Sequence, residues 1–130
     1  MRKFLLALLA PLALGAAACG GEEAEPLSPD QARTYFTNIE GLLDQVVTAH
    51  DQGDTDQAAE LAGQAYLDNF EHLEHDLEEK DHELNERIEG LLGPPFRQAI
   101  QKGMSQDALE SRVEEIRTLL EDAEVALGVA

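Results

Sequence analysis

The chain has 130 residues, of which 43% are hydrophobic and 28% charged. Nine Lys and Arg against 27 Asp and Glu give a formal net charge of −18, which argues against nucleic acid and anionic lipid surfaces as electrostatic partners, because their phosphates are repelled. A single cysteine allows neither an internal disulfide nor a cysteine-based zinc site. The absence of Trp and the 5% content of aromatic residues favour helices packed through small side chains.

The first 18 residues have the pattern of a cleavable export signal. Arg2 and Lys3 precede an apolar run, residues 4–18, that is too short to cross a hydrocarbon core of about 30 Å. We therefore predict a signal peptide over residues 1–18. Removing it leaves seven basic and 27 acidic residues, a net charge of −20.

Two interpretations of the cleavage site before Cys19 remain open. The three alanines at 16–18 satisfy the small-x-small rule of an ordinary secreted protein. The same stretch resembles a bacterial lipobox, although Ala16 stands where Leu is usual. Because the one cysteine is at this position, we expect a lipoprotein with palmitate-type acyl chains on Cys19, held to the membrane through a flexible acidic tether over 19–27. Gly20, which is not Asp, favours the periplasmic face of an outer membrane if the cell is Gram-negative.

Residues 28–130 show a helical period with clear start and stop signals. The sequence at 28–31, Ser-Pro-Asp-Gln, has the residues of a capping box with proline in the first turn. Apolar residues then recur every three or four positions, and Gly53 ends this helix. A second helix is predicted over 54–80.

Asp81 is expected to cap a third helix, which is interrupted at 93–95, Gly-Pro-Pro, because proline lacks an amide donor and clashes with the preceding turn. Gly103 ends this helix and Ser105 begins a fourth. All the loops are short, so neighbouring helices should run in opposite directions. The prediction for 28–130 is an all-α, up-down antiparallel four-helix bundle with a kinked or split third helix.

Three of the four histidines and a dense set of carboxylates lie in the segment 68–82. Positions three and four apart are neighbours on a helix, so we expect one polar ridge made of Asp68, Glu71, His72, His75, Glu78, Glu79 and His82. These groups are ligands of iron, zinc, manganese and copper. With no Lys or Arg from 68 to 79, the carboxylates repel one another, and a cation would relieve that cost. A merely solvated face is the alternative interpretation.

Other sites find little support in the sequence. It contains no Gly-rich phosphate loop, no His-Glu-x-x-His and no Gly-x-Ser-x-Gly. A di-iron bundle needs Glu-x-x-His pairs on two helices, and only Glu79-x-x-His82 fits. Met104 is the one methionine after the signal, which argues against a His/Met haem site. We therefore expect that the protein is not an enzyme.

The sequence Tyr-Leu-Asp-Asn-Phe-Glu-His-Leu-Glu at 66–74, followed by Ile88-Glu89, Phe96-Arg97 and Gly103, resembles a known helical domain. This is the extracytoplasmic domain in front of bacterial high-affinity iron permeases, the iron/lead transporter family. The similarity covers about residues 59–103, and the positions that match the recurring pattern are Tyr66, Phe70, Glu71, Glu74, Glu89 and Arg97.

The resemblance implies that the chain captures iron or docks to a permease and its helper proteins. It makes Glu71, Glu74 and Glu89 ligand candidates, with Tyr66 and Phe70 in the core. The interruption at 93–95 is not typical of that domain. Residues 19–130 contain no run of about 20 apolar residues, so the permease itself would be a separate protein.

Together these patterns predict a lipid-anchored extracytoplasmic bundle that binds iron or another divalent metal and assists its uptake by a separate permease. The predicted metal ligands are Asp68, Glu71, Glu74, His75 and Glu89. One alternative is a metal-free interaction module of the cell envelope that docks a transporter or a basic partner through its acidic surface. A periplasmic chaperone or spacer is a third possibility.

Overall fold

The computed structural model describes residues 25–130, so the predicted signal peptide and Cys19 lie outside the described residues. The described part of the chain is all-helical, without strands, and confirms the predicted class and the four helices. The helical elements are α1 (Pro29–Asp51), α2 (Thr55–Ala65), the π-helical η1 (Tyr66–Phe70), α3 (Glu71–Lys80), α4 (His82–Leu92), α5 (Pro94–Gln101) and α6 (Gln106–Ala126). The elements α2, η1 and α3 follow one another without a break and form the second helix.

The helix starts are fixed by side-chain caps at the predicted positions. Ser28 Oγ accepts from the amide of Gln31 at 3.2 Å, and Gln31 Oε1 accepts from the amide of Ser28 at 3.0 Å, which completes the capping box. The side chains of Asp54, Asp81 and Ser105 cap α2, α4 and α6 by accepting from the amides of Gln57, Leu84 and Ala108. Each cap satisfies a backbone donor that has no partner inside its helix.

The third helix is broken at Gly93. The amide of this glycine donates to Glu89 O at 2.9 Å, but Pro94 and Pro95 have no N–H with which to continue the series. Helix α4 therefore ends at Leu92 and α5 begins at Pro94. A Cβ atom on Gly93 would lie 2.4 Å from Glu89 O, so only glycine fits this close approach.

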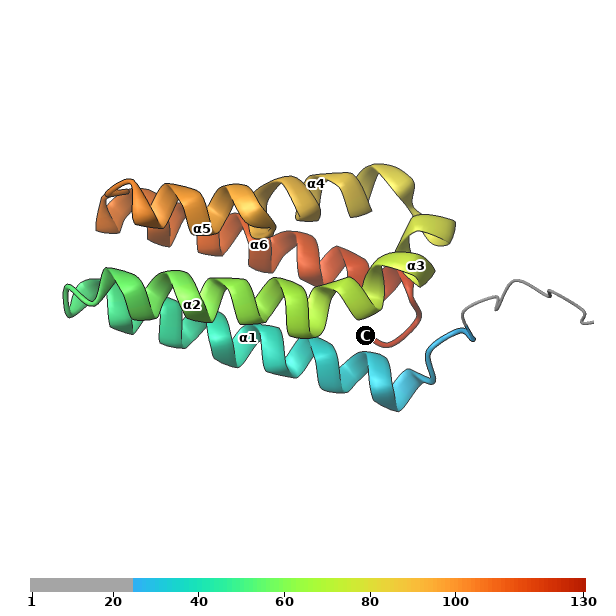
Figure 1. Cartoon of the computed structure of the whole chain (residues 1–130). Helices are drawn as coiled ribbons and strands as arrows, with labels where there is room; N and C mark the ends of the chain where they lie inside the picture. The colour runs from blue at the N-terminus through green and yellow to red at the C-terminus, as the bar shows by residue number, and fades with distance from the viewer. Residues whose placement is uncertain (1–24) are drawn as a thin grey trace, which may run out of the picture.

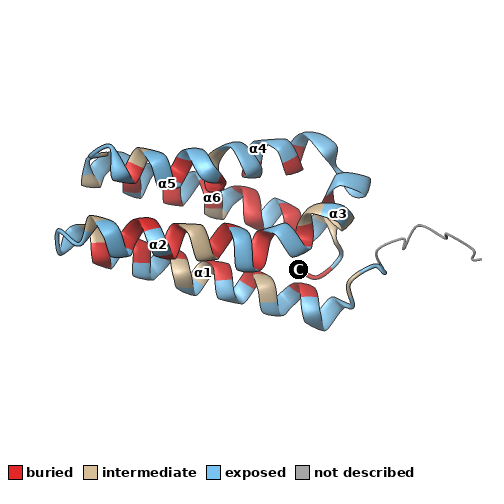
Figure 2. Cartoon of the chain, viewed as in Figure 1, coloured by how far each residue is buried: buried red, intermediate tan, exposed pale blue. Residues whose placement is uncertain are grey.

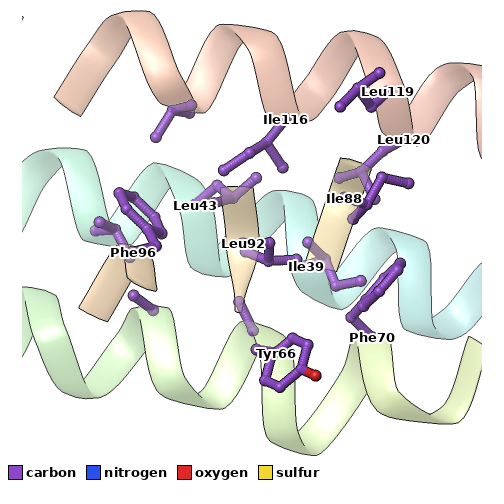
Figure 3. Close-up of a cluster of buried hydrophobic side chains, with 14 of the residues drawn as sticks. Ile39, Leu43, Tyr66, Phe70, Ile88, Leu92, Phe96, Ile116, Leu119 and Leu120 are labelled. Atoms are coloured by element: carbon purple, nitrogen blue, oxygen red, sulfur yellow. The ribbon is translucent and has the colours of Figure 1, made fainter. Parts of the chain in front are cut away.

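The helices enclose one apolar core. Helix α1 packs against α2 and α6, α2 packs against α5, and α4 packs against α6, which closes a ring of four helices (Figure 1). The buried residues form the inward stripe of each helix (Figure 2). Figure 3 shows side chains of all four helices meeting there, with Tyr66 at the margin of the cluster. None of the helices in 25–130 combines the length and apolarity needed to cross a bilayer.

The two ends of the described chain lie together, beside α3 (Figure 1). The amide of Leu27 donates to Asp76 Oδ2 of α3 at 2.8 Å. At the C-terminus, Val129 O accepts from Arg33 Nε of α1 at 3.3 Å. The described chain therefore begins at the end of the bundle where α3 turns into α4.

Candidate functional site

The second helix carries the predicted site, and a π turn at Tyr66–Phe70 sets its geometry. A π turn holds one residue more than an α turn. Tyr66 and Glu74 are eight residues apart in the sequence, but after the π turn they have the relative orientation of residues seven apart in a regular helix, roughly 20° around the axis. In an uninterrupted α-helix they would be roughly 80° apart. The same extra residue keeps Leu73 and Leu77 fully buried after the turn. The π turn thus brings Tyr66 and Glu74 to one side of the helix.

Asn69 holds the π turn to the neighbouring helix, a role that the sequence analysis missed. It is only 5% exposed. Its Nδ2 donates to Gln64 O at 3.1 Å, and its Oδ1 accepts from Asn38 Nδ2 of α1 at 3.1 Å. An asparagine within the apolar stripe, next to Phe70, was the signal in the sequence for a buried polar contact.

A hollow of about 390 Å³ opens between α3 and α4, here called the α3–α4 pocket. Three of the five predicted metal ligands line it, together with two residues that were not predicted as ligands. The lining residues are Glu71, Glu74, His75, Glu78 and Asn85. No lysine or arginine is among them, so the pocket is surrounded by acceptors and negative charge.

Glu74 is the most perturbed carboxylate of this pocket. Burial is the main reason that its pKa is raised, and the charges of Glu89 and Glu71 raise it further, while the neighbouring hydroxyl of Tyr66 acts in the opposite direction. The pKa of Tyr66 is raised as well, first by burial and then by Glu74. Glu74 Oε1 is buried and accepts no hydrogen bond from any described residue. Because the charge of Glu89 raises the pKa of Glu74, this fourth predicted ligand lies within electrostatic reach of Glu74.

The fifth predicted ligand lies apart from the others. Asp68 lines a smaller hollow of about 160 Å³ with Glu60 and Arg97, on the side facing α5. His72, a member of the predicted ridge, stacks on Tyr35 of α1 with ring centroids 4.8 Å apart. Within residues 25–130, no three His, Cys, Asp or Glu side chains stand in an arrangement that could hold a metal ion. The pocket thus gathers candidate ligands without closing them into a coordination sphere.

A second acidic hollow, between α1 and α6, contains its own cation. It measures about 480 Å³, and Asp44, Glu114 and Arg117 are among its lining residues. Arg117 lies 3.3 Å from Glu40 and 2.5 Å from Asp44. The hydrogen bond to Asp44 is the first cause of a raised pKa of Arg117. Arg117 therefore offsets part of the negative charge of this hollow, whereas the lining of the α3–α4 pocket contains no lysine or arginine.

An exposed histidine, His82, borders the pocket and should make the stability of the fold depend on pH. His82 Nδ1 hydrogen-bonds to Glu78, and His82 Nε2 lies 3.4 Å from Glu86 Oε1. The pKa of His82 is raised above 6.5, first by the hydrogen bond and charge of Glu78 and then by the charge of Glu86. The protonated form is thus favoured in the folded state, so the stabilisation is complete below the unfolded pKa and is lost as the pH rises through the folded pKa.

Replacing Glu78 with Gln should bring the pKa of His82 back toward its ordinary value, because the main favourable partner of the imidazolium is removed. An NMR titration of the His82 ring resonances measures this shift. Glu86→Gln is the matched control and should give a smaller decrease. Equal decreases in the two variants would show that Glu78 is not the dominant partner.

The chain matches no protein-family model, no characterised protein and no solved structure.

Proposed function

We propose that the protein is a lipid-anchored capture protein of the cell envelope, which binds iron or another divalent metal and assists its uptake by a separate permease. One observation carries the proposal. The α3–α4 pocket gathers Glu71, Glu74 and His75 with no lysine or arginine in its lining, whereas Arg117 offsets part of the negative charge in the hollow between α1 and α6. Uncompensated carboxylates around a hollow attract a cation and are relieved by it.

The ligand set proposed for the metal combines a fixed group with mobile groups. Glu74 is partly buried, and its position is restricted, whereas Glu71 and Glu89 are exposed and can turn toward it. Such an arrangement suits capture followed by release, because few ligands are held in place beforehand. The match of Tyr66, Glu71, Glu74 and Glu89 to the pattern of the iron-permease domain supports iron as the cargo.

The scaffold of this proposal is the up-down antiparallel bundle with its third helix split at Gly93. A lipid on Cys19 would hold the bundle by the end at which Leu27 and α3 meet. The α3–α4 pocket lies near that end, so a captured ion would be held close to the membrane that contains the permease. No enzymatic step is required of the protein.

A thermal-shift experiment with anaerobic Fe²⁺ tests metal capture. A ligand that binds only the folded state stabilises it by roughly 2.7 kcal/mol at a free concentration 100 times its Kd, so Tm should rise by several degrees in the wild type. Glu74→Gln should abolish this rise. Without metal, the same variant should melt above the wild type at neutral pH, because the raised pKa of Glu74 means that its ionised form destabilises the folded state.

Glu115→Gln is the matched control. It removes the same charge from an exposed position on α6 and should keep the full Fe²⁺ response. If Fe²⁺ fails to raise the wild-type Tm, or if both variants keep the rise, the capture proposal is wrong.

A metal-free interaction module is the second candidate. It is favoured by the absence, within 25–130, of three ligands already placed around a metal position, and by the net charge of −20 after the predicted signal. Such a module would bind a basic or transporter partner in a salt-sensitive way. Salt-dependent retention of one specific protein, with no Fe²⁺ response, would favour this function.

A further inference from the structure

Asn85 of α4 presents a buried oxygen atom that no described residue satisfies. The residue is 6% exposed, and its Nδ2 donates to Glu78 Oε2 at 3.0 Å. A carboxylate oxygen only accepts, so the amide nitrogen must be the atom that faces Glu78, and this fixes the orientation of the amide group. Its Oδ1 is therefore turned away from Glu78, is buried, and accepts no hydrogen bond.

Glu74 Oε1 of α3 is in the same condition. It too is buried without a hydrogen-bond partner among residues 25–130. Both side chains line the α3–α4 pocket, one from each helix. Buried polar atoms are nearly always satisfied in native proteins, so two free acceptors on one hollow favour a ligand that donates hydrogen bonds or carries positive charge.

Glu78 keeps this arrangement in place. Its Oε2 accepts from Asn85, and its Oε1 is hydrogen-bonded to His82 Nδ1. Both of its oxygens therefore already have hydrogen-bond partners. Glu78 is a positioning residue that holds the amide of Asn85, and the free oxygens left for a ligand are those of Glu74 and Asn85.

We propose that Asn85 Oδ1 and Glu74 Oε1 are two ligands of one oxygen-lined seat for a hard cation between α3 and α4. Amide carbonyl and carboxylate oxygens suit hard cations, which prefer oxygen, and are poor ligands for soft metals such as Cu(I). The cargo class is therefore a hard cation of charge +2 or +3. This inference rests on the proposed capture function and adds to it a neutral ligand on α4 and a preference for oxygen.

Tb³⁺ is a suitable probe, because it is a hard cation and its luminescence is sensitised by a nearby tyrosine. Tyr66 lies beside Glu74 and would supply the energy transfer. Titrating the purified full chain with Tb³⁺ should give saturable emission. Asn85→Leu should weaken binding about tenfold, in the range found when groups around a metal are removed. Asn85→Asp loses the donation to Glu78 but keeps an oxygen at this position and adds a negative charge, so it should bind at least as tightly as the wild type.

Glu74→Gln is the positive control for loss of Tb³⁺ binding, and Glu115→Gln is the control for charge alone. Circular dichroism identifies any variant that does not fold, and Asn85→Asp then decides through its retained or increased affinity. If both Asn85 variants bind Tb³⁺ as the wild type does while Glu74→Gln loses it, the role of Asn85 is wrong and capture at Glu74 stands. If Tb³⁺ does not bind but Fe²⁺ still raises Tm, the hard-cation seat is wrong. If neither ion acts, both proposals fall.

Discussion

Replacing Gly93 with alanine is expected to lower the free energy of unfolding by roughly 2–4 kcal/mol, among the larger effects of a single substitution. The added Cβ would stand 2.4 Å from the backbone oxygen of Glu89 and 3.5 Å from the ring of Tyr66. The oxygen belongs to the last turn of α4 and accepts the Gly93 amide, so it cannot withdraw without breaking that hydrogen bond. The end of α4 must therefore shift, and with it the junction to α5.

Gly90→Ala is the matched control, three residues earlier and inside α4. A Cβ at Gly90 meets nothing within 4 Å, and the position is exposed. Alanine is the better helix former by about 0.8–1.0 kcal/mol, so this variant should be more stable than the wild type. Urea unfolding followed by circular dichroism measures both changes. The same effect from both substitutions would contradict the role given to the contact between Gly93 and Glu89.

Replacing Phe70 with alanine should lower the free energy of unfolding by roughly 3–5 kcal/mol. The ring is fully buried and stacks against Tyr66 with centroids 6.1 Å apart. It lies inside the cluster in which the four helices meet (Figure 3). A cavity here would also loosen the π turn that brings Tyr66 and Glu74 to the same side of the second helix.

Leu67→Ala in the same π turn provides the comparison. Leu67 is 49% exposed, so its truncation should change stability by no more than about 0.5 kcal/mol. The two variants are measured by the same denaturant unfolding curves. A large loss for Leu67→Ala, or a small one for Phe70→Ala, would show that the turn is oriented differently.

The helix boundaries could be predicted from the sequence because their signals are local. Ser28, Asp54, Asp81 and Ser105 cap neighbouring amides, and the proline pair after Gly93 interrupts a helix in any context. The burial of Tyr66 and Phe70, expected from the resemblance, is confirmed.

The π turn could not be predicted, because an α-helix and a helix with one extra residue fit the same short apolar pattern. The turn also explains why the predicted ligands divide. Glu71, Glu74 and His75 follow it and share the pocket, whereas the extra residue rotates Asp68 away from them.

Contacts between residues on different helices are the other feature that could not be predicted from the sequence. Asn69 and Asn85 lie at core positions, and their hydrogen bonds to Asn38 of α1 and Glu78 of α3 offset part of the cost of that burial. The pairing of Arg117 with Glu40 and Asp44 joins residues more than 70 positions apart and leaves no local pattern. The proximity of Glu89 to Glu74 was expected through the resemblance alone.

Because both ends of the described chain lie beside α3, the order of the helices along the chain can be changed without changing how they pack. A short peptide from Ala130 to Leu27 would span neighbouring points, since Arg33 of the first helix already contacts Val129. New termini could then be opened at Gly53 or Gly103, which occupy exposed turns with φ of 79° and 92°. Such a circular permutant keeps every helix–helix interface and moves the free ends, with any fused reporter, to the opposite end of the bundle from the α3–α4 turn.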